Sequence, residues 1–219
     1  ADESRALNSL HRVFFSTAPP KRSIFLVGTG LIGGALLKLM SGREDMRLVG
    51  LANKQNMFFD AHGIAPKHAQ ELLTAKGTLS SMSECIKTMK NMALTNSIFV
   101  DCTASEELTQ EYADILRTGI SIVTPNKKAN SGPYARYQNL KKLAQKNKVP
   151  FIYETNVGAG LPLLHTLNTL VLSGDKILKI EAILSGTLSY IFNTFSKSKS
   201  SFSQVVREAK AKGYTEPDP

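Results

Sequence analysis

Continuous apolar runs of strand length alternate with segments of helical periodicity along most of this chain. Such runs are typical of parallel strands buried on both faces of a sheet. They lie at residues 23–27, 46–52, 97–101, 120–123 and 151–153. Helical segments lie among them, at 35–40, 66–91, 106–117 and 131–148, with Ser131 as an expected N-cap and Pro133 in the first turn. This alternation predicts an α/β fold with a doubly wound parallel sheet.

The pattern changes past Thr155, and we expect a domain change near there. Beyond it the chain is expected to form an apolar helix after a glycine-rich turn, an alternating strand and two more helices, at 156–172, 176–184, 186–195 and 202–212. The last helix ends at Gly213. We expect three parts. Residues 1–20 are a connector, with a short helix near 5–13 and a linker at 16–20; residues 21–155 are an α/β domain; and residues 156–219 are the start of an α+β domain.

Composition narrows the class of protein. The 219 residues are 42% hydrophobic and 21% charged with a mean hydropathy of −0.12, typical of a soluble globular chain. These figures exclude a disordered tail, a collagen-like repeat and a membrane bundle, and no apolar run approaches the ~20 residues of a membrane-spanning helix. No secretory signal is visible, and Cys85 and Cys102 are too few for a disulfide framework. A reducing, cytoplasmic location is therefore expected.

The net charge of +9 has two interpretations. It suits a polyanion such as nucleic acid, or a small anionic ligand such as a phosphorylated cofactor. The lysines between 141 and 148 have no aromatic residues among them, so a solvated basic helix face accounts for that run. We therefore expect no nucleic-acid partner; a DNA affinity that falls steeply with salt would revive that interpretation.

A glycine motif, Gly28-Thr-Gly-Leu-Ile-Gly33, follows the first apolar run and precedes a helix and a second strand. That context is typical of the turn that binds the pyrophosphate of a dinucleotide. Gly28 would make the tight turn, Gly30 would let the backbone approach the ligand, and Gly33 would allow close helix–strand packing. The amides of Leu31 and Ile32 would point at the anion from the helix N-terminus.

The end of the second strand bears on the choice of cofactor. NAD-binding proteins usually place Asp or Glu there, to accept from the ribose 2′-hydroxyl. This chain instead has Ala52-Asn53-Lys54. A carboxylate would repel a 2′-phosphate, whereas Asn53 and Lys54 can hold one. The sequence therefore favours NADP, with NAD as the second choice; the alternative is that Lys54 is merely exposed.

Two further strand ends carry polar residues. Parallel sheets bind ligands at the carboxyl ends of their strands, so Thr103 is expected on the nicotinamide side. Cys102 could be proposed as a thiol nucleophile, but no His nearby in sequence raises its thiolate fraction, which favours core packing. One of Lys127 and Lys128 should point inward, where it can reach a ligand carbonyl or carboxylate, and we favour Lys127.

Six segments occur along the chain in this order: Gly28-Thr-Gly-Leu-Ile-Gly-Gly34, Asp101-Cys-Thr103, Val123-Thr-Pro-Asn-Lys-Lys-Ala-Asn130, Glu154-Thr-Asn-Val-Gly-Ala-Gly-Leu-Pro162, Leu184-Ser-Gly-Thr-Leu-Ser-Tyr-Ile-Phe192 and Gly213-Tyr-Thr-Glu-Pro-Asp-Pro219. Together they resemble homoserine dehydrogenase, particularly the form fused behind an aspartokinase. The resemblance implies a Rossmann domain and NAD(P)-dependent hydride transfer between L-homoserine and L-aspartate 4-semialdehyde, in threonine and methionine biosynthesis. It also implies a homo-oligomer with a small-molecule substrate, no membrane partner and an aspartokinase module in the parent protein.

The resemblance further implies a monovalent cation, sodium or potassium. It would be held by Glu154, Val157, Ala159 and Leu161, largely through backbone carbonyls. From the residues alone, this loop is a glycine-rich turn whose freed carbonyls suit a hard cation better than a soft one. A plain hinge is the alternative interpretation.

For the substrate, the resemblance implies that Gly186 and Thr187 touch the amino-acid end and that Glu216 binds the ammonium. Glu216 is otherwise an exposed loop carboxylate. Family members continue beyond Pro219 into a helix with the lysine regarded as the proton donor, so turnover by residues 1–219 alone is expected to be essentially lost. Our first hypothesis is an oxidoreductase with a truncated substrate half; the second is a fragment that binds NADP and catalyses nothing.

Overall fold

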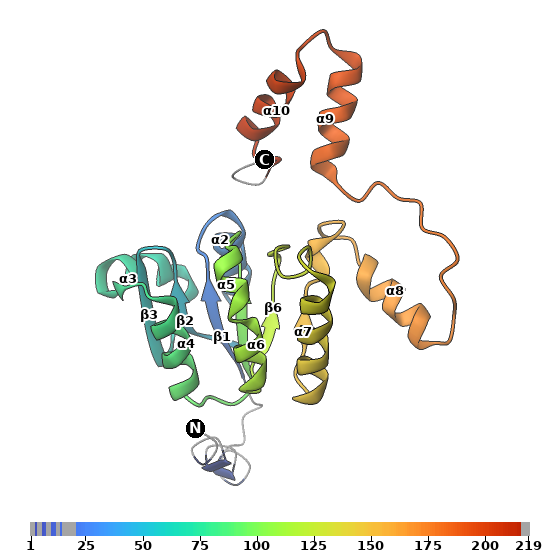
Figure 1. Ribbon diagram of the computed structural model, residues 1–219. Helices are drawn as coiled ribbons and strands as arrows, with labels where there is room; N and C mark the ends of the chain where they lie inside the picture. The colour runs from blue at the N-terminus through green and yellow to red at the C-terminus, as the bar shows by residue number, and fades with distance from the viewer. Residues whose placement is uncertain (1–2, 4–5, 8–9, 12–13, 15–20, 216–219) are drawn as a thin grey trace. The chain divides into compact units, whose positions relative to one another are not determined.

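The computed structural model describes residues 3, 6–7, 10–11, 14 and 21–215, and the chain divides into two compact units, 1–153 and 154–219 (Figure 1). The expected helix near 5–13 lies largely outside the described residues, and the linker at 16–20 lies wholly outside them. Within the described part, no helix is both long and apolar enough to cross a membrane.

A seven-stranded sheet in the order β4-β3-β2-β1-β5-β6-β7 forms the centre of the first unit. Its strands are β1 (Arg22–Val27), β2 (Met46–Ala52), β3 (Asn56–Ile64), β4 (Thr78–Leu79), β5 (Ser97–Asp101), β6 (Ser121–Val123) and β7 (Phe151–Ile152). Strands β2, β1, β5, β6 and β7 run parallel to one another. Strand β3 pairs antiparallel with β2 on one side and with β4 on the other. The chain leaves β1 towards β2 and later returns to its other side as β5, which makes a topological switch point between β1 and β5.

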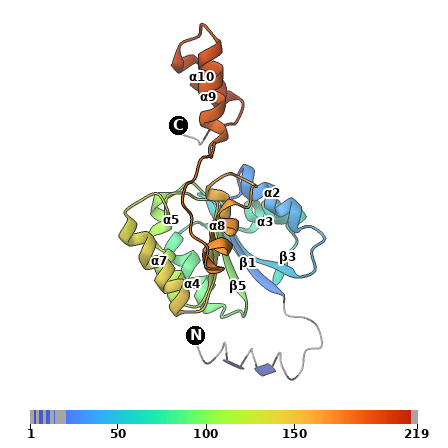
Figure 2. The same ribbon diagram turned by 90° about the vertical axis from the view of Figure 1, so that its right-hand side faces the viewer.

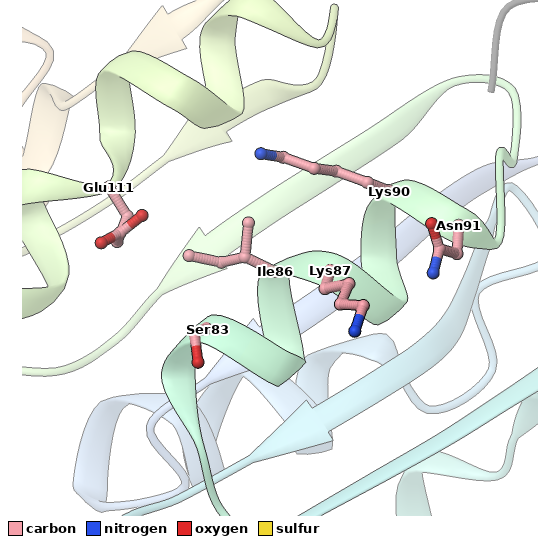
Figure 3. A pocket seen from close by; sticks show the side chains of 6 residues that line it. All are labelled: Ser83, Ile86, Lys87, Lys90, Asn91 and Glu111. Atoms are coloured by element: carbon pink, nitrogen blue, oxygen red, sulfur yellow. The ribbon is translucent and has the colours of Figure 1, made fainter.

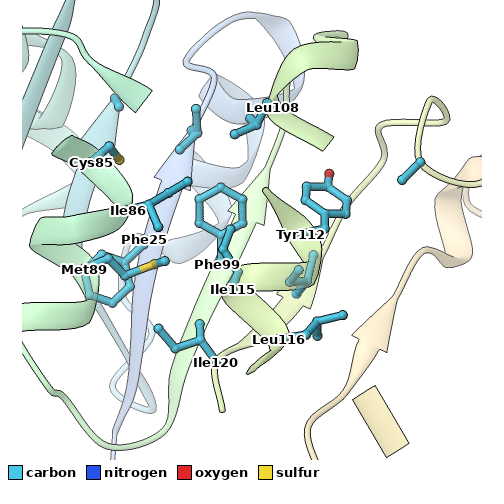
Figure 4. Packing of buried hydrophobic residues seen from close by; sticks show 14 of the residues in the cluster. Phe25, Cys85, Ile86, Met89, Phe99, Leu108, Tyr112, Ile115, Leu116 and Ile120 are labelled. Atoms are coloured by element: carbon cyan, nitrogen blue, oxygen red, sulfur yellow. The ribbon is translucent and has the colours of Figure 1, made fainter. Parts of the chain in front are cut away.

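Helices cover both faces of this sheet. They are α2 (Leu31–Met40), η1 (Pro66–His68), α3 (Ala69–Lys76), α4 (Met82–Asn91), α5 (Glu106–Gln110), α6 (Tyr112–Arg117) and α7 (Tyr134–Lys146). Figure 2 shows α2 and α3 on one side of the sheet, and α4, α5 and α7 on the other. Alternate residues of β1 enter separate cores. Phe25 belongs to a cluster that includes residues of α4, α6 and α7 (Figure 4 labels those of α4 and α6), and Leu26 belongs to one that includes residues of α2 and α3. The predicted doubly wound α/β fold is confirmed.

Several local expectations were wrong. The pattern did not predict β3 or β4, because β3 is a half-buried antiparallel strand interrupted by the polar residues Asp60 and His62. The helix expected at 106–117 is two short helices that meet at Glu111. The helix expected from Ser131 begins at Tyr134 with Pro133 at its N-cap, because Pro133 has an extended ψ of 129° and lies outside the helical turn.

The second unit contains η2 (Glu154–Asn156), α8 (Leu163–Leu172), α9 (Gly186–Lys197) and α10 (Phe202–Ala211). Helices α9 and α10 pack together around Ile191, Val205 and Ala209. The strand expected at 176–184 is not formed: this segment is exposed and has no regular structure. A strand needs a hydrogen-bonded neighbour, and no described residue pairs with this segment as a strand.

Candidate functional site

The glycine turn between β1 and α2 is held in place by the protein's own packing. Gly28 has φ +94°, and a Cβ there would lie 2.8 Å from the Cys102 backbone. A Cβ on Gly33 would lie 1.9 Å from the Gly28 carbonyl oxygen. At Gly30, by contrast, no described atom lies within 4 Å of a Cβ position. Fold packing therefore explains Gly28 and Gly33, while the open space at Gly30 is what close approach of a ligand to the backbone requires.

Helix α2 presents an open N-terminus beside this space. Its N-cap, Gly30, provides no side chain to the first turn, and that turn contains no acidic residue. The first two helical residues, Leu31 and Ile32, are exposed. The amides at a helix start lack intrahelical acceptors and carry partial positive charge. The turn thus offers an anion both backbone donors and room, and the predicted binding of a pyrophosphate by Leu31 and Ile32 stays a prediction.

The end of β2 lies beside the end of β1, where Val27 pairs with Ala52. Ala52 is buried, and its carbonyl oxygen accepts from Gly28 N at 2.9 Å. The Asn53 Oδ1 atom accepts from the backbone N–H groups of Gln55 and Asn56, each at 2.8 Å. The Asn53 oxygen therefore holds the turn into β3, and only its amide nitrogen is left to meet a ligand. Lys54 is exposed at the tip of this turn.

A buried hydrogen-bond network lies at the carboxyl end of β5. Asp101, 0% exposed, accepts from Thr103 N at 2.7 Å through Oδ1. Its Oδ2 accepts from Tyr112 Oη at 2.6 Å and from Asn126 Nδ2 at 2.9 Å. Burial and the Asp101 charge raise the pKa of the Tyr112 phenol well above its ordinary value, so Tyr112 remains a donor.

The same network reaches the carboxyl end of β6. The Thr124 hydroxyl donates to the Asp101 carbonyl oxygen at 2.9 Å and accepts from Asn126 N at 2.9 Å. Asn126 Nδ2 also donates to Ser105 O at 2.9 Å. Sequence reasoning noted Asp101 only as part of a motif and missed Tyr112 and Asn126. An acidic residue at the end of an apolar strand was the available signal, but its partners are distant in sequence.

The expectation that one of Lys127 and Lys128 points inward is wrong, because both side chains are exposed. Asn126, just before the two lysines, is buried, and it donates to Asp101 and Ser105. For Cys102, burial first and the neighbouring Asp101 charge second raise the thiol pKa to about 12. Cys102 is therefore a protonated packing residue at neutral pH, as the sequence favoured.

A shallow pocket lies elsewhere in the first unit, along α4 and at the junction of α5 and α6 (Figure 3). Its volume is about 250 Å³, and it is lined by Ser83, Ile86, Lys87, Lys90, Asn91 and Glu111. None of the predicted site residues lines this pocket. The candidate site is therefore the carboxyl edge of the sheet and not this hollow.

In the second unit, the 154–161 loop has features that suit a hard cation. Glu154 Oε2 accepts from His165 N at 2.9 Å, while Oε1 is buried and has no hydrogen-bond partner among the described residues. Gly158 and Ala159 have φ values of +72° and +51°, so the backbone reverses there. The described residues contain no cluster of three His, Cys, Asp or Glu side chains. A cation at this loop would therefore need backbone carbonyls as well as the Glu154 carboxylate.

The predicted substrate residues Gly186 and Thr187 begin α9. The Thr187 hydroxyl donates to the Tyr214 carbonyl oxygen, which brings the end of α10 to the start of α9. Glu216 lies outside the described residues. A second polar cluster supports the same junction: Tyr190 Oη donates to Glu208 Oε1 at 2.9 Å, and Lys212 Nζ lies 2.7 Å from that oxygen. Sequence reasoning missed this cluster.

Comparison with protein families gives two adjacent matches. The family described as "Homoserine dehydrogenase, NAD binding domain" matches residues 28–154. The family described as "Homoserine dehydrogenase" matches residues 162–219. The first match contains the glycine turn and the Asp101 network, and the second contains α8, α9 and α10.

Individual relatives agree with these matches. The chloroplastic bifunctional aspartokinase/homoserine dehydrogenase 2 of Arabidopsis thaliana is 42% identical over 100% of this chain and 25% of its own length. The homoserine dehydrogenase of Schizosaccharomyces pombe is 38% identical over 90% of this chain and 56% of its own. The chain thus spans about a quarter of the first relative and about half of the second.

Two solved structures share the fold. A Candida auris protein described as of unknown function has a TM-score of 0.76 at 32% identity, over 92% of this chain and 58% of its own. A hyperthermophilic archaeal homoserine dehydrogenase in complex with NADPH has a TM-score of 0.72 at 25% identity. That match covers 91% of this chain and 63% of the archaeal one.

Proposed function

The chain belongs to the homoserine dehydrogenase family, and we propose that it is part of an enzyme that interconverts L-homoserine and L-aspartate 4-semialdehyde. The observation that carries the proposal is the open space at Gly30 beside the uncapped start of α2, between two glycines that the fold itself requires. A bound NADP supplies the hydride acceptor of such a reaction. The chain's own residues would bind it, orient it and exclude water.

The proposed cofactor residues follow the carboxyl edge of the sheet. The turn from Gly28 to Gly33, with the amides of Leu31 and Ile32, would hold the pyrophosphate. Ala52, the Asn53 amide nitrogen and Lys54 would surround the adenosine ribose, where Lys54 favours a 2′-phosphate over a hydroxyl. Thr103 and Lys127 would lie at the nicotinamide end, because they follow β5 and β6. Lys127 is the proposed catalytic residue.

The second unit would supply the amino-acid subsite and the cation. Gly186, Thr187 and Glu216 are proposed to bind homoserine, and Thr187 already fixes the backbone of Tyr214, two residues before Glu216. A sodium or potassium ion is proposed at Glu154, Val157, Ala159 and Leu161. The buried Glu154 oxygen without a hydrogen-bond partner supports this ion, because a cation would neutralise it.

Other properties of the parent protein are proposals taken from its relatives. A fused aspartokinase module is proposed because bifunctional relatives align over the whole chain. A homo-oligomer and a role in threonine and methionine biosynthesis are proposed with it. The cytoplasm remains the location predicted from sequence, although the Arabidopsis relative is chloroplastic by name.

The test is a titration of residues 1–219 with NADPH, followed by addition of aspartate 4-semialdehyde. Binding of NADPH by residues 1–219 supports the cofactor site, and turnover in the same experiment by a polypeptide of the family's full length supports the whole proposal. Binding without turnover in both polypeptides selects the second hypothesis, a fragment that binds NADP and catalyses nothing. In a polypeptide of the family's full length, Lys127→Ala should lower kcat more than Lys128→Ala, and the reverse order would reassign the catalytic lysine.

A further inference from the structure

One buried carboxylate has no part in the function proposed above. Asp101 is 0% exposed, and it follows three apolar residues at the end of β5. Burying a carboxylate is costly unless hydrogen bonds replace its water. Here the replacement comes from neutral donors: one backbone N–H, one phenol and one side-chain amide. An apolar residue would avoid this cost. The position of the carboxylate in the fold therefore suggests what it contributes.

The three donors belong to three separate segments. Thr103 lies in the loop after β5, Tyr112 begins α6, and Asn126 lies in the loop after β6. Asn126 also reaches the Ser105 carbonyl, so the two loops are joined directly as well as through Asp101. The carboxylate therefore fixes the 102–105 loop and the 124–127 loop against each other.

The sheet order separates these two loops from the residues proposed for the adenosine half. With the order β2-β1-β5-β6, Lys54 follows β2 on one side of β1, and the network follows β5 and β6 on the other side. A dinucleotide bound across the switch point would place its nicotinamide half over β5 and β6. The Asp101 side chain bonds only to segments on that side, although Cys102 and Thr103 also pack against Gly28 of the glycine turn.

We propose that Asp101 is the positioning residue of the nicotinamide half-site, a role that rests on the proposed NADP function. By holding the two loops together, it places Thr103 and Lys127 where the nicotinamide and its ribose bind. The end of β2, proposed for the adenosine ribose, is not among the segments that the Asp101 side chain bonds. A merely structural role for Asp101 would instead affect both halves through the stability of the whole unit.

The experiment compares two ligands by isothermal titration calorimetry on residues 1–219. One is NADPH; the other is 2′-phosphoadenosine 5′-diphosphate, which has the same adenosine half but neither the nicotinamide nor its ribose. Asp101→Asn should weaken NADPH about tenfold, since an amide leaves at least one buried donor without an acceptor. It should change the affinity for the second ligand by less than about twofold. Tyr112→Phe removes a single donor, and should give the same selective pattern with about a threefold loss.

Ser97→Ala is the matched control. Ser97 is also buried and polar, and its hydroxyl donates to Leu94 O at 2.7 Å from the opposite end of the same strand. Its loss should lower the melting temperature but leave the ratio of the two affinities unchanged. An equal loss for both ligands in the Asp101 and Tyr112 variants would overturn the positioning role, as would no loss for either.

The same measurements distinguish failure of the proposed function from failure of the positioning role. If the wild-type chain binds neither ligand, the NADP site itself is wrong and the inference falls with it. If the wild type binds both and the variants keep the NADPH affinity, only the positioning role is wrong. Should Asp101→Asn fail to fold, Tyr112→Phe carries the same test, because its ring stays in the core between Phe99 and Phe151.

Discussion

Charged side chains have different surroundings at the two edges of the parallel sheet. At the amino edge, the Asp45 carboxylate accepts from Arg43 Nε at 2.8 Å and from Arg22 Nη1 at 3.1 Å, and all three side chains are exposed. At the carboxyl edge, the Asp101 carboxylate is buried and hydrogen-bonded to neutral donors. One edge keeps its charges in water, where pairing contributes little. The other removes a charge from water and must replace every lost hydrogen bond.

This difference indicates which edge of the sheet is sensitive to substitution. Exposed ion pairs at the amino edge can be changed with small effects, because water compensates for a lost partner. The carboxyl edge combines a tight turn, an open space at Gly30 and a fully bonded buried carboxylate, which together make a preformed surface. Substitutions at the two edges should therefore differ in size and in what they affect.

The largest effect is expected for Gly33→Ala. The new methyl group would lie 1.9 Å from the Gly28 carbonyl oxygen, so either α2 or the glycine turn must move. Overpacking of this kind should lower the free energy of unfolding by about 3 kcal/mol and abolish NADPH binding. Denaturant melts monitored by circular dichroism would measure the first effect.

The neighbouring substitution Gly34→Ala provides its control. A Cβ there would lie 3.7 Å from Gln70 Nε2, an ordinary contact, inside the same helix. Alanine is the better helix former, so a gain of about 0.5–1 kcal/mol is expected. Equal destabilisation by both variants would show that helix α2, and not the contact with Gly28, sets the result.

A second prediction separates binding from stability at Gly30. Because no described atom lies within 4 Å of the Cβ position, Gly30→Ala should change the free energy of unfolding by less than about 0.5 kcal/mol. It should still weaken NADPH about tenfold or more, since the methyl group occupies the path of the pyrophosphate. Gly160→Ala, equally open but in the second unit, should change neither quantity. Unaltered NADPH affinity in Gly30→Ala would place the ligand elsewhere.

Lys54→Ala should have a smaller, selective effect. Loss of one charge-assisted contact to a 2′-phosphate should cost about 1–2 kcal/mol of NADP binding and leave NAD binding unchanged. Lys38→Ala removes an equally exposed lysine near the far end of α2, and should alter neither affinity. Parallel losses for NADP and NAD would mean that Lys54 does not distinguish the two cofactors.

The smallest effect is expected at the amino edge. The hydrogen bond from Arg43 lowers the pKa of Asp45 from 3.8 to about 2. Because the pKa is lowered in the folded state, the stabilisation is present above pH 4 and is lost as the pH falls towards 2. Asp45→Asn should thus leave the melting temperature at pH 7 nearly unchanged, since the pair is exposed. An NMR titration of the Asp45 carboxyl carbon checks the pKa, and an ordinary value near 3.8 would contradict the pairing.

Much of the carboxyl edge could be predicted from sequence because its signals are local. The glycine turn, the strand before it and the helix after it lie within 20 residues, and each has its own pattern. The absence of an acidic residue at Asn53-Lys54 is likewise a local fact. These features follow from backbone geometry and strand burial, which short windows of sequence reveal.

The remainder depends on contacts between distant residues. Asp101 and Asn126 are 25 positions apart, and nothing in either segment alone indicates that they bond. Of two adjacent residues in one loop, Asn126 is buried and Lys127 is exposed, and the loop sequence does not show which of them is buried. Strand β3 was missed for a related reason, since an antiparallel strand needs only half of its side chains buried.

Binding of NADP at the carboxyl edge of the sheet can be tested by amide hydrogen exchange with and without NADPH. Exchange should slow on NADPH binding in two peptides, 28–34 with the open start of α2, and 101–105 with the loop fixed by Asp101. Peptides at the amino edge, around Arg22 and Asp45, should not change. Protection confined to the amino edge, or absent from both carboxyl-edge peptides under saturating NADPH, would show that NADP does not bind at the carboxyl edge.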